Sequence, residues 1–357
     1  MRKHQFRKLG LMAYIKKGSK RLEIKNMIST LSFRKVMNLF LLTFTYHFSR
    51  LLGRPLHYGM PWSIAVEPTT SCNLRCPECP SGLRSFTRPT GMLEPGTFSK
   101  IISEIKPWLG HLTFYFQGEP FLNPSFLDLV ALAVKNGIHT STSTNAHYLK
   151  YETALRTVRS GLHRILISID GADQETYEQY RIGGDIEKVL EGTRNLVRAK
   201  NELGSSTPHI VFQFLVVRPN EFQIPEIERL AKEYGVDEVK IKTAQIYDFE
   251  NGSALIPVQE QYSRYQKDSN GKYSIKNKLL NQCWKMWQSC VITWDGKVVP
   301  CCFDKDAHHQ LGNVSINGFR KVWEGLAYRS FRSSILKSRK EIDICTNCTE
   351  GTRVWAE

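Results

Sequence analysis

The 357-residue sequence contains no uninterrupted apolar run of the roughly 20 residues that a membrane-spanning helix needs. It also contains no internal repeat and no low-complexity segment, which argues against a solenoid and against a disordered chain. We expect no secretory signal, because no N-terminal stretch combines a short charged start, an apolar centre and a small-residue cleavage site. The length suggests a large catalytic domain with an accessory one.

Acidic residues are scarce, with 34 Asp and Glu against 49 Lys and Arg, and the first 35 residues supply +10 of the net charge of +15. These contain eleven Lys and Arg and one acid, Glu23. An apolar run follows at 36–48, interrupted by Asn38 and His47, and we expect it to form an amphipathic helix. Such a segment could lie on an anionic bilayer surface, or the tail could be solvated while the helix packs on the catalytic domain. An organelle-targeting peptide is a third alternative, because such peptides are also basic and poor in acids. We expect a cytoplasmic protein that binds no nucleic acid, with peripheral membrane contact through residues 1–52 as an alternative.

Nine cysteines are an odd number for disulfide pairing, and most of them lie in short clusters, which favours metal or cluster ligands in a reducing cytosol. Cys72, Cys76 and Cys79 have three and then two residues between them. Three thiolates can ligate three irons of a four-iron cluster and leave the fourth iron open for a substrate or cofactor. Zinc is the alternative, but structural zinc sites favour four ligands and no fourth lies nearby.

Apolar strand patterns alternate with helical patterns from residue 62 onward. Expected strands cover 63–66, 111–116, 140–144, 164–170, 210–217 and 238–242, and expected helices cover 98–105, 126–135, 151–159, 186–202 and 224–234. This succession predicts a parallel sheet with covering helices, whose reactive groups gather at the carboxyl ends of the strands. Cys72, Glu119, Asn145, Asp170 and Arg218 fall at or just beyond such ends.

Together these features resemble the radical S-adenosylmethionine (SAM) superfamily over about 60–245. The resemblance rests on the cysteine loop, Gly118-Glu119-Pro120, Ser143-Thr144-Asn145, and Ser168-Ile169-Asp170-Gly171 with Arg181 downstream; Gln117 replaces a glycine that is usual in the family. It implies a partial (β/α)6 barrel, a [4Fe–4S] cluster on Cys72, Cys76 and Cys79, and SAM chelating the open iron. The implied SAM-binding residues are Gly118, Glu119, Pro120, Asn145, Ser168, Asp170 and Arg181. An Arg fork suits the SAM carboxylate, and Ser168 and Asp170 can hydrogen-bond ribose or ammonium groups.

Six further cysteines lie beyond the barrel, at 283, 290, 301, 302, 345 and 348. Asp295-Gly296 predicts a tight hairpin turn whose second arm ends at Cys301. Residues 281–351 resemble the SPASM or "twitch" auxiliary domain, which implies a second, fully ligated [4Fe–4S] cluster on Cys283, Cys301, Cys345 and Cys348. Cys302 is the alternative to Cys301, and a zinc ribbon is the alternative to the cluster. We interpret Cys290 as a buried apolar residue, and His308 and His309 as loop residues.

We therefore expect an α/β protein, a partial (β/α)6 TIM-like barrel with a small C-terminal α+β auxiliary cluster domain. Residues 1–59 would form the basic tail and amphipathic helix, 60–245 the barrel, 246–280 a polar connector, and 281–357 the auxiliary domain.

The resemblance implies an enzyme that reductively cleaves SAM and abstracts hydrogen from a small-molecule or peptide substrate, using an electron donor such as flavodoxin or ferredoxin. The C-terminal cysteine spacing resembles that of an aminocyclitol alcohol dehydrogenase, which favours an oxidation or dehydrogenation assisted by the second cluster. We expect no leader-peptide recognition domain before residue 60, which disfavours peptide maturation. A peptide or protein maturase, a membrane-surface enzyme acting on a lipid or envelope glycan, and a non-catalytic iron–sulfur or zinc scaffold stay open as alternatives. The sequence does not identify the substrate.

Overall fold

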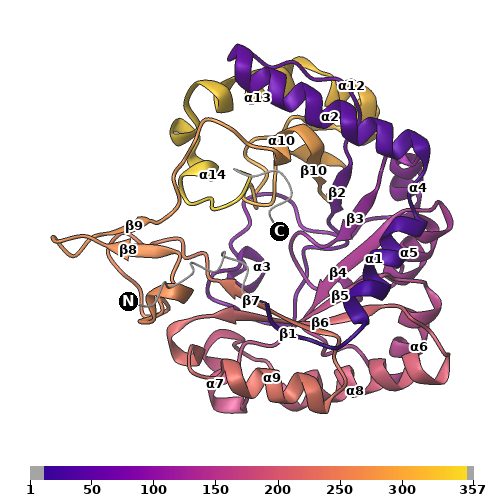
Figure 1. Cartoon of the computed structure of the whole chain (residues 1–357), viewed down its shortest axis with the longest axis vertical. Helices are drawn as coiled ribbons and strands as arrows, with labels where there is room; N and C mark the ends of the chain where they lie inside the picture. Colours follow the sequence, from indigo (N-terminus) through magenta and orange to yellow (C-terminus); the bar gives the residue numbers. More distant parts are fainter. Residues whose placement is uncertain (1–11, 352–357) are drawn as a thin grey trace, which may run out of the picture.

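A curved sheet of six parallel strands forms the centre of the protein, as seen in a computed structural model that describes residues 12–351 (Figure 1). The strands are β2 (Ser63–Val66), β3 (His111–Phe114), β4 (His139–Thr144), β5 (Arg164–Ser168), β6 (His209–Val216) and β7 (Glu238–Thr243). Each pairs with the next along the chain, so their carboxyl ends meet at one edge of the sheet. This arrangement confirms the predicted α/β fold and partial barrel.

The helices between the strands cover the outer face of the sheet (Figure 1). They are α4 (Pro95–Ile105), α5 (Phe126–Lys135), α6 (Tyr151–Arg159), α7 (Gln174–Tyr180), α8 (Ile186–Glu202) and α9 (Ile224–Glu233), with short 3-10 turns η1 (Pro120–Leu122) and η2 (Arg218–Asn220). Ile102 of α4, Phe114 of β3 and Phe212 of β6 belong to one continuous core and are at most 2% exposed. The regular alternation of strand and helix patterns therefore predicts five of these six helices, and α7 is the helix that it does not include.

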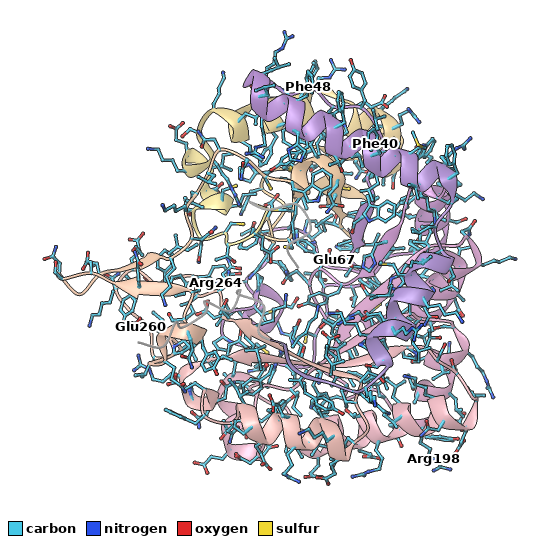
Figure 2. All side chains as sticks on the ribbon, viewed as in Figure 1. Phe40, Phe48, Glu67, Arg198, Glu260 and Arg264 are labelled. Carbon is cyan, nitrogen blue, oxygen red and sulfur yellow. The ribbon has the colours of Figure 1, made fainter. Side chains whose placement is uncertain are left out.

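The chain before the barrel is more ordered than a tail. β1 (Met12–Ile15) pairs antiparallel with β7, and α1 (Ser19–Ser29) and α2 (Phe33–Leu52) follow. The expected helix at 36–48 is thus longer, and Phe40 and Phe48 project from its outer side (Figure 2). The first eleven residues of the predicted basic tail lie outside the described residues. Within the described part of the chain, none of the helices combines the length and the apolar character needed to span a membrane.

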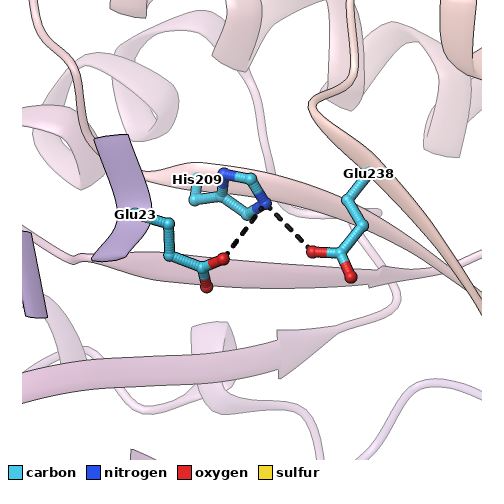
Figure 3. A group of neighbouring side chains, drawn as sticks. All are labelled: Glu23, His209 and Glu238. Carbon is cyan, nitrogen blue, oxygen red and sulfur yellow. Dashed lines mark hydrogen bonds and ion pairs between the residues drawn. The ribbon is translucent and has the colours of Figure 1, made fainter. Parts of the chain in front are cut away.

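Helix α1 is anchored through Glu23, which meets His209 and Glu238 at the amino ends of β6 and β7 (Figure 3). His209 Nε2 lies 3.1 Å from Glu238 Oε2 and 3.7 Å from Glu23 Oε2. Three such groups within 4.8 Å could hold a metal ion, but the Arg164 guanidinium pairs with both carboxylates. Since the guanidinium already bridges both carboxylates, we interpret the group as a structural ion-pair anchor.

The C-terminal part continues the barrel sheet. β10 (Ser289–Ile292) pairs in parallel with β2, and β11 (Lys297–Val299) and β12 (Gly312–Asn313) add antiparallel strands beyond it. The predicted hairpin turn is present, with Gly296 at φ 83°. The accompanying helices are α10 (Lys285–Gln288), α11 (Val314–Asn317), α12 (Phe319–Trp323), α13 (Leu326–Ser338) and α14 (Asp343–Thr346), with η4 (Arg339–Glu341) before the last.

The polar segment at 246–280, expected as a connector, contains η3 (Glu260–Tyr262) and a hairpin of β8 (Tyr265–Lys267) and β9 (Tyr273–Ile275) that projects from the left of the molecule (Figure 1). Its turn is held by Asp268 Oδ1, which accepts hydrogen bonds from the backbone N–H groups of Asn270 and Lys272, both at 2.9 Å. The strands of this hairpin are three residues each, too short to give a recognisable alternation of apolar and polar residues.

Candidate functional site

Cys72, Cys76 and Cys79 lie on the loop between β2 and the short helix α3 (Pro80–Leu83), at the carboxyl edge of the sheet. The Arg75 N–H donates to Ile182 O at 2.9 Å, which fixes the loop against the segment after α7. Burial raises the pKa of Cys72 to about 11, and the nearby Glu119, Cys76 and Cys79 act in the same direction. Three thiols held close together in a buried loop fit a cationic cluster, because iron binds the thiolate form.

The turn at Gly118 packs directly on this loop. Gly118 has φ +74°, its N–H donates to Ser81 Oγ at 2.9 Å, and a Cβ there would lie 2.2 Å from Thr69 O. The Glu119 N–H donates to Ser71 O at 2.8 Å. Only glycine fits this close approach of two backbones, so the predicted Gly-Glu-Pro turn, with Pro120 buried at the start of η1, is built onto the cysteine loop.

Glu119 and Asn145 join the ends of β3 and β4. The Glu119 carboxylate, 2% exposed, accepts hydrogen bonds from Thr144 Oγ1 and from the Asn145 N–H, both at 2.7 Å. Burial raises the pKa of Glu119 to about 7. The Asn145 amide donates to Asn73 Oδ1 at 2.7 Å, and Asn73 stands next to Cys72. Asn73 therefore connects the predicted SAM residues to the cysteine loop, a role for which the sequence offered no signal.

Asp170 holds Arg181 toward the cysteines. The fully buried Asp170 accepts from the Leu215 N–H at 2.7 Å and from Arg181 Nε at 2.5 Å. Arg181 Nη1 lies 3.7 Å from Cys76 Sγ. Each Asp170 oxygen thus has a protein partner, and the carboxylate orients Arg181. The predicted contact of Asp170 with the cofactor stays a prediction. Ser168 is buried at the end of β5 beside this pair.

The structure therefore brings together all the predicted residues of the first site, at one edge of the sheet. Arg218, another strand-end residue, donates from its Nε to Ile256 O at 3.0 Å and so ties the chain after β6 to the 246–280 segment.

The second cysteine set lines a small pocket. Cys283, Cys301, Cys345 and Cys348 contribute to its wall, whereas Cys302 is exposed and Cys290 is buried in β10. Burial raises the pKa of Cys348 to about 12. Four thiols around one cavity are a donor set that could hold a fully ligated cluster. His308 and His309, expected to be loop residues, pair with Asp306 and Asp343.

Arg339 is a residue of this second site that sequence reasoning missed. It is fully buried, and its Nη2 lies 3.1 Å from Cys348 Sγ. The same nitrogen donates to Glu350 O at 2.8 Å, and Nη1 donates to Gln282 O at 3.0 Å. A fixed guanidinium beside a thiolate ligand stabilises negative charge on that ligand. In the sequence it precedes Lys340 in a basic, polar stretch, which gave it the appearance of a surface residue.

Lys305 connects the C-terminal part of the chain to the first cysteine loop. Its Nζ donates to Tyr247 Oη at 2.8 Å, and the Tyr247 N–H donates to Glu78 Oε2 at 2.8 Å within the first cysteine loop. Burial lowers the pKa of Lys305, while the nearby Cys79 and Cys302 oppose that shift. This lysine of the auxiliary domain therefore reaches the first cysteine loop.

Arg264 adds a second cation to the same region, since it too acts electrostatically on Lys305. Its Nη2 donates to Thr243 O at 3.0 Å. Its buried Nε and Nη1 have no hydrogen-bond partner among the residues that the structure describes. Two nitrogens of the Arg264 guanidinium are thus available to donate to a ligand with acceptor oxygens.

A buried ion pair fastens the barrel to the auxiliary domain. The Glu67 carboxylate, directly after β2, accepts hydrogen bonds from Arg88 Nη1 and Nη2 at 2.8 and 2.6 Å. The Arg88 Nε donates to Lys305 O at 3.2 Å, and the Trp294 N–H donates to Glu67 Oε2 at 3.3 Å. The two predicted sites are therefore held in one framework.

Comparisons with known proteins agree with this geometry. The radical SAM superfamily matches residues 66–223, and the SPASM iron–sulfur cluster-binding domain matches residues 283–349. The chain is 25% identical over 316 residues to a tungsten-containing aldehyde ferredoxin oxidoreductase cofactor-modifying protein of Pyrococcus furiosus, covering 80% of this chain and 86% of the relative. It is 30% identical over 206 residues to PqqA peptide cyclase of Gluconobacter oxydans, covering 56% and 55%.

Among solved structures, SuiB of Streptococcus suis bound to S-adenosylmethionine superposes with a TM-score of 0.59 at 14% identity, covering 82% of this chain and 73% of that chain. At this identity the likeness concerns the fold alone, and it agrees with the partial barrel and its C-terminal extension.

Proposed function

Because this chain belongs to the radical SAM superfamily and carries a SPASM iron–sulfur domain, we propose that it oxidises a carbon centre of a peptide that carries a carboxylate. The enzyme uses SAM, a [4Fe–4S] cluster that binds it, and further iron–sulfur chemistry in the SPASM domain. We assign the first cluster to Cys72, Cys76 and Cys79, and a second cluster to Cys283, Cys301, Cys345 and Cys348. When bound and reduced, the first cluster and SAM would supply a 5′-deoxyadenosyl radical, the species that removes a hydrogen atom.

The observation that carries the proposal is the connection between the two cysteine sets. Lys305 belongs to the auxiliary domain, and its Nζ donates to Tyr247 Oη, while the Tyr247 N–H donates to Glu78 in the first cysteine loop. A substrate held beside Lys305 would therefore lie between the two proposed clusters, which suits an oxidation in which a second electron leaves toward the auxiliary domain.

The protein groups have separate tasks in this proposal. Arg181, oriented by Asp170, supplies a cation for the SAM carboxylate. Gly118 and Glu119 set the backbone that would receive the SAM ammonium, and Glu119 and Asn145 keep that turn on the cysteine loop. The chain places these groups on strand ends, so they are preorganised by the sheet.

The proposed peptide class rests on charge and on the relatives. Lys305 and the unpartnered nitrogens of Arg264 favour an anionic group such as a carboxylate. PqqA peptide cyclase, one of the relatives, is named for a peptide substrate. We propose a cytoplasmic location and a small electron-transfer protein, such as flavodoxin or ferredoxin, as the reductant.

Anaerobic reconstitution followed by iron analysis and SAM cleavage tests the two cluster assignments. We expect about eight irons per chain, from two four-iron clusters, and release of 5′-deoxyadenosine after reduction. Cys76→Ala should abolish cleavage, whereas Cys345→Ala should keep some cleavage and lose substrate turnover. Cys301→Ala should lose about four irons, and its matched control Cys302→Ala should keep all of them.

Three outcomes would contradict the proposal. Bound zinc with no SAM cleavage would indicate a scaffold. Equal losses in Cys76→Ala and Cys345→Ala would mean that the second cluster is structural. For the substrate class, acidic and amidated versions of the same peptide library are compared. Turnover of both at the same rate, unaffected by Lys305→Met, would refute the carboxylate requirement.

A further inference from the structure

Helix α2 turns its polar side toward the protein. Four polar residues of this helix are buried against the rest of the protein: Lys35, Asn38, Thr45 and Ser49. Lys35 is 3% exposed and Ser49 is 0% exposed. The Asn38 side chain exchanges hydrogen bonds with the Met60 backbone at 2.8 and 2.9 Å, and Ser49 Oγ donates to Leu56 O at 2.7 Å. Because these polar groups are satisfied only in this orientation, the helix is fixed with its other side facing outward.

The outward side of α2 is a continuous apolar stripe. Its residues recur at intervals of three and four, which places them on one face of a helix. They are Phe33, Met37, Phe40, Phe44, Phe48 and Leu51, with exposed fractions of 82%, 47%, 67%, 51%, 42% and 79%. Figure 2 shows Phe40 and Phe48 on the outer side of the helix at the top of the molecule. Contiguous apolar surface of this kind marks an interaction site.

The stripe is held by a rigid support. Tyr46, on the inner side of α2, packs edge-on against Trp284 and Trp287 at centroid distances of 5.3 and 5.5 Å. The preceding helix α1 is fastened to the barrel through the ion pair of Glu23 with Arg164. The exposed Phe side chains of α2 are therefore held in place by the folded protein.

The charge around the apolar stripe of α2 indicates which partner binds it. Residues 1–66 contain thirteen Lys and Arg and one acid, Glu23, which is ion-paired with Arg164 of the barrel. Helix α2 has no acid at all, and the exposed Arg34, Arg50 and Arg54 flank its stripe. A second copy of the chain would bring two such basic regions together and would be repelled. A surface that accepts Phe side chains and attracts Lys and Arg is an anionic lipid bilayer.

We propose that α2 docks in the plane of an anionic bilayer, with Phe33, Phe40, Phe44 and Phe48 inserted at the headgroup boundary. The helix lies on the membrane and does not cross it. This docking is independent of the proposed peptide oxidation, and it holds the barrel beside the bilayer whatever the substrate is.

Co-sedimentation of the full-length chain with vesicles tests the proposal. We expect binding to vesicles of equimolar phosphatidylglycerol and phosphatidylcholine, and little binding to phosphatidylcholine alone. The double variant Phe40→Asp/Phe44→Asp should bind about a hundredfold more weakly, because each buried Phe contributes about a tenfold factor or more. Arg50→Gln/Arg54→Gln should weaken binding by roughly fivefold for each charge and reduce its salt dependence.

Phe222→Asp is the matched control, because Phe222 is 75% exposed and precedes α9 by two residues. Helix α9 lies on the opposite side of the molecule from α2 (Figure 1). It should bind vesicles like the unmodified chain. Equal binding by Phe40→Asp/Phe44→Asp, or no binding to anionic vesicles, would overturn the proposal. A dimer in analytical ultracentrifugation that only the double variant disrupts, without vesicle binding, would assign the stripe to a second copy. Production of 5′-deoxyadenosine should be unchanged in the double variant, so a failure of docking is distinguishable from a failure of the proposed chemistry.

Discussion

Replacing Arg339 should lower the reduction potential of the auxiliary cluster that we assign to Cys283, Cys301, Cys345 and Cys348. The guanidinium is fully buried and lies 3.1 Å from the Cys348 sulfur. Reduction adds one negative charge to the cluster, and a fixed cation at this distance favours the reduced form. Arg339→Gln removes the cation and should therefore make the cluster harder to reduce.

The magnitude follows from the geometry. An iron atom behind the sulfur places the added electron about 5–6 Å from the guanidinium, taking a metal–sulfur bond of about 2.3 Å. At an effective dielectric constant of about 20, two unit charges at that distance interact by about 3 kcal/mol. For a one-electron couple this equals about 130 mV. Because the electron is shared over several irons, we expect a fall of roughly 100 mV in Arg339→Gln and a smaller fall in Arg339→Lys, which keeps the charge.

The assay is a redox titration followed by electron paramagnetic resonance, in a background where Cys72, Cys76 and Cys79 are alanines so that only the auxiliary cluster is observed. Iron analysis first establishes that each variant keeps four irons. Lys340→Gln is the matched control, because Lys340 is the next residue, carries the same charge and is exposed. A potential in Arg339→Gln equal to that of the control, with four irons retained, would refute the electrostatic role of Arg339.

Three further predictions test the framework around the two sites. Gly118→Ala should reduce SAM cleavage about a hundredfold, because the added Cβ would displace the turn from the cysteine loop. The control Gly96→Ala should have normal activity, because a Cβ at residue 96 meets open space. Equal activity of the two variants would contradict this role of the turn. Arg88→Met should lower the free energy of unfolding in urea by about 3–5 kcal/mol, because it leaves the fully buried Glu67 carboxylate without its cation. Adding Glu67→Gln should recover part of this loss. If Arg88→Met is as stable as the double variant, the Arg88–Glu67 ion pair is unimportant for stability. Burial lowers the pKa of His139 to about 2, and His111 and His163 act in the same direction, so between pH 2 and 6.5 only the unfolded chain takes up this proton. The free energy of unfolding should therefore fall by about 1.4 kcal/mol per pH unit below about pH 6.5. His139→Asn should flatten the dependence of this free energy, measured in urea, on pH between 6.5 and 5, and an unchanged slope would disprove the assignment.

The barrel and the first site could be predicted because one rule connects them. Parallel strands end at the same edge, so Cys72, Glu119, Asn145 and Asp170, far apart in the sequence, had to meet there. The strand patterns contain enough apolar residues for this rule to apply. The contact of Asn73 with Asn145 was invisible, because a polar residue in a loop has no periodicity that points to its partner.

The orientation of α2 could not be predicted for a different reason. Periodicity identifies two faces of a helix and suggests that the apolar one is buried. Here the buried face includes Asn38 and Ser49, whose partners are backbone groups of Met60 and Leu56. Such bonds depend on how the chain returns after the helix, which residue patterns do not encode. Arg339 was missed similarly, since its burial follows from the packing of the cysteine cavity around it.

The parallel pairing of β10 with β2 has a consequence for how the protein is made. As the ribosome synthesises the chain, residues 63–66 emerge early and residues 289–292 emerge near the end. Until then, the β2 edge of the growing sheet presents unpaired backbone N–H and C=O groups, a known template for association with other chains. Expression of the barrel without the auxiliary domain should leave that edge open permanently, and slower translation should prolong the interval in which chaperones must protect it.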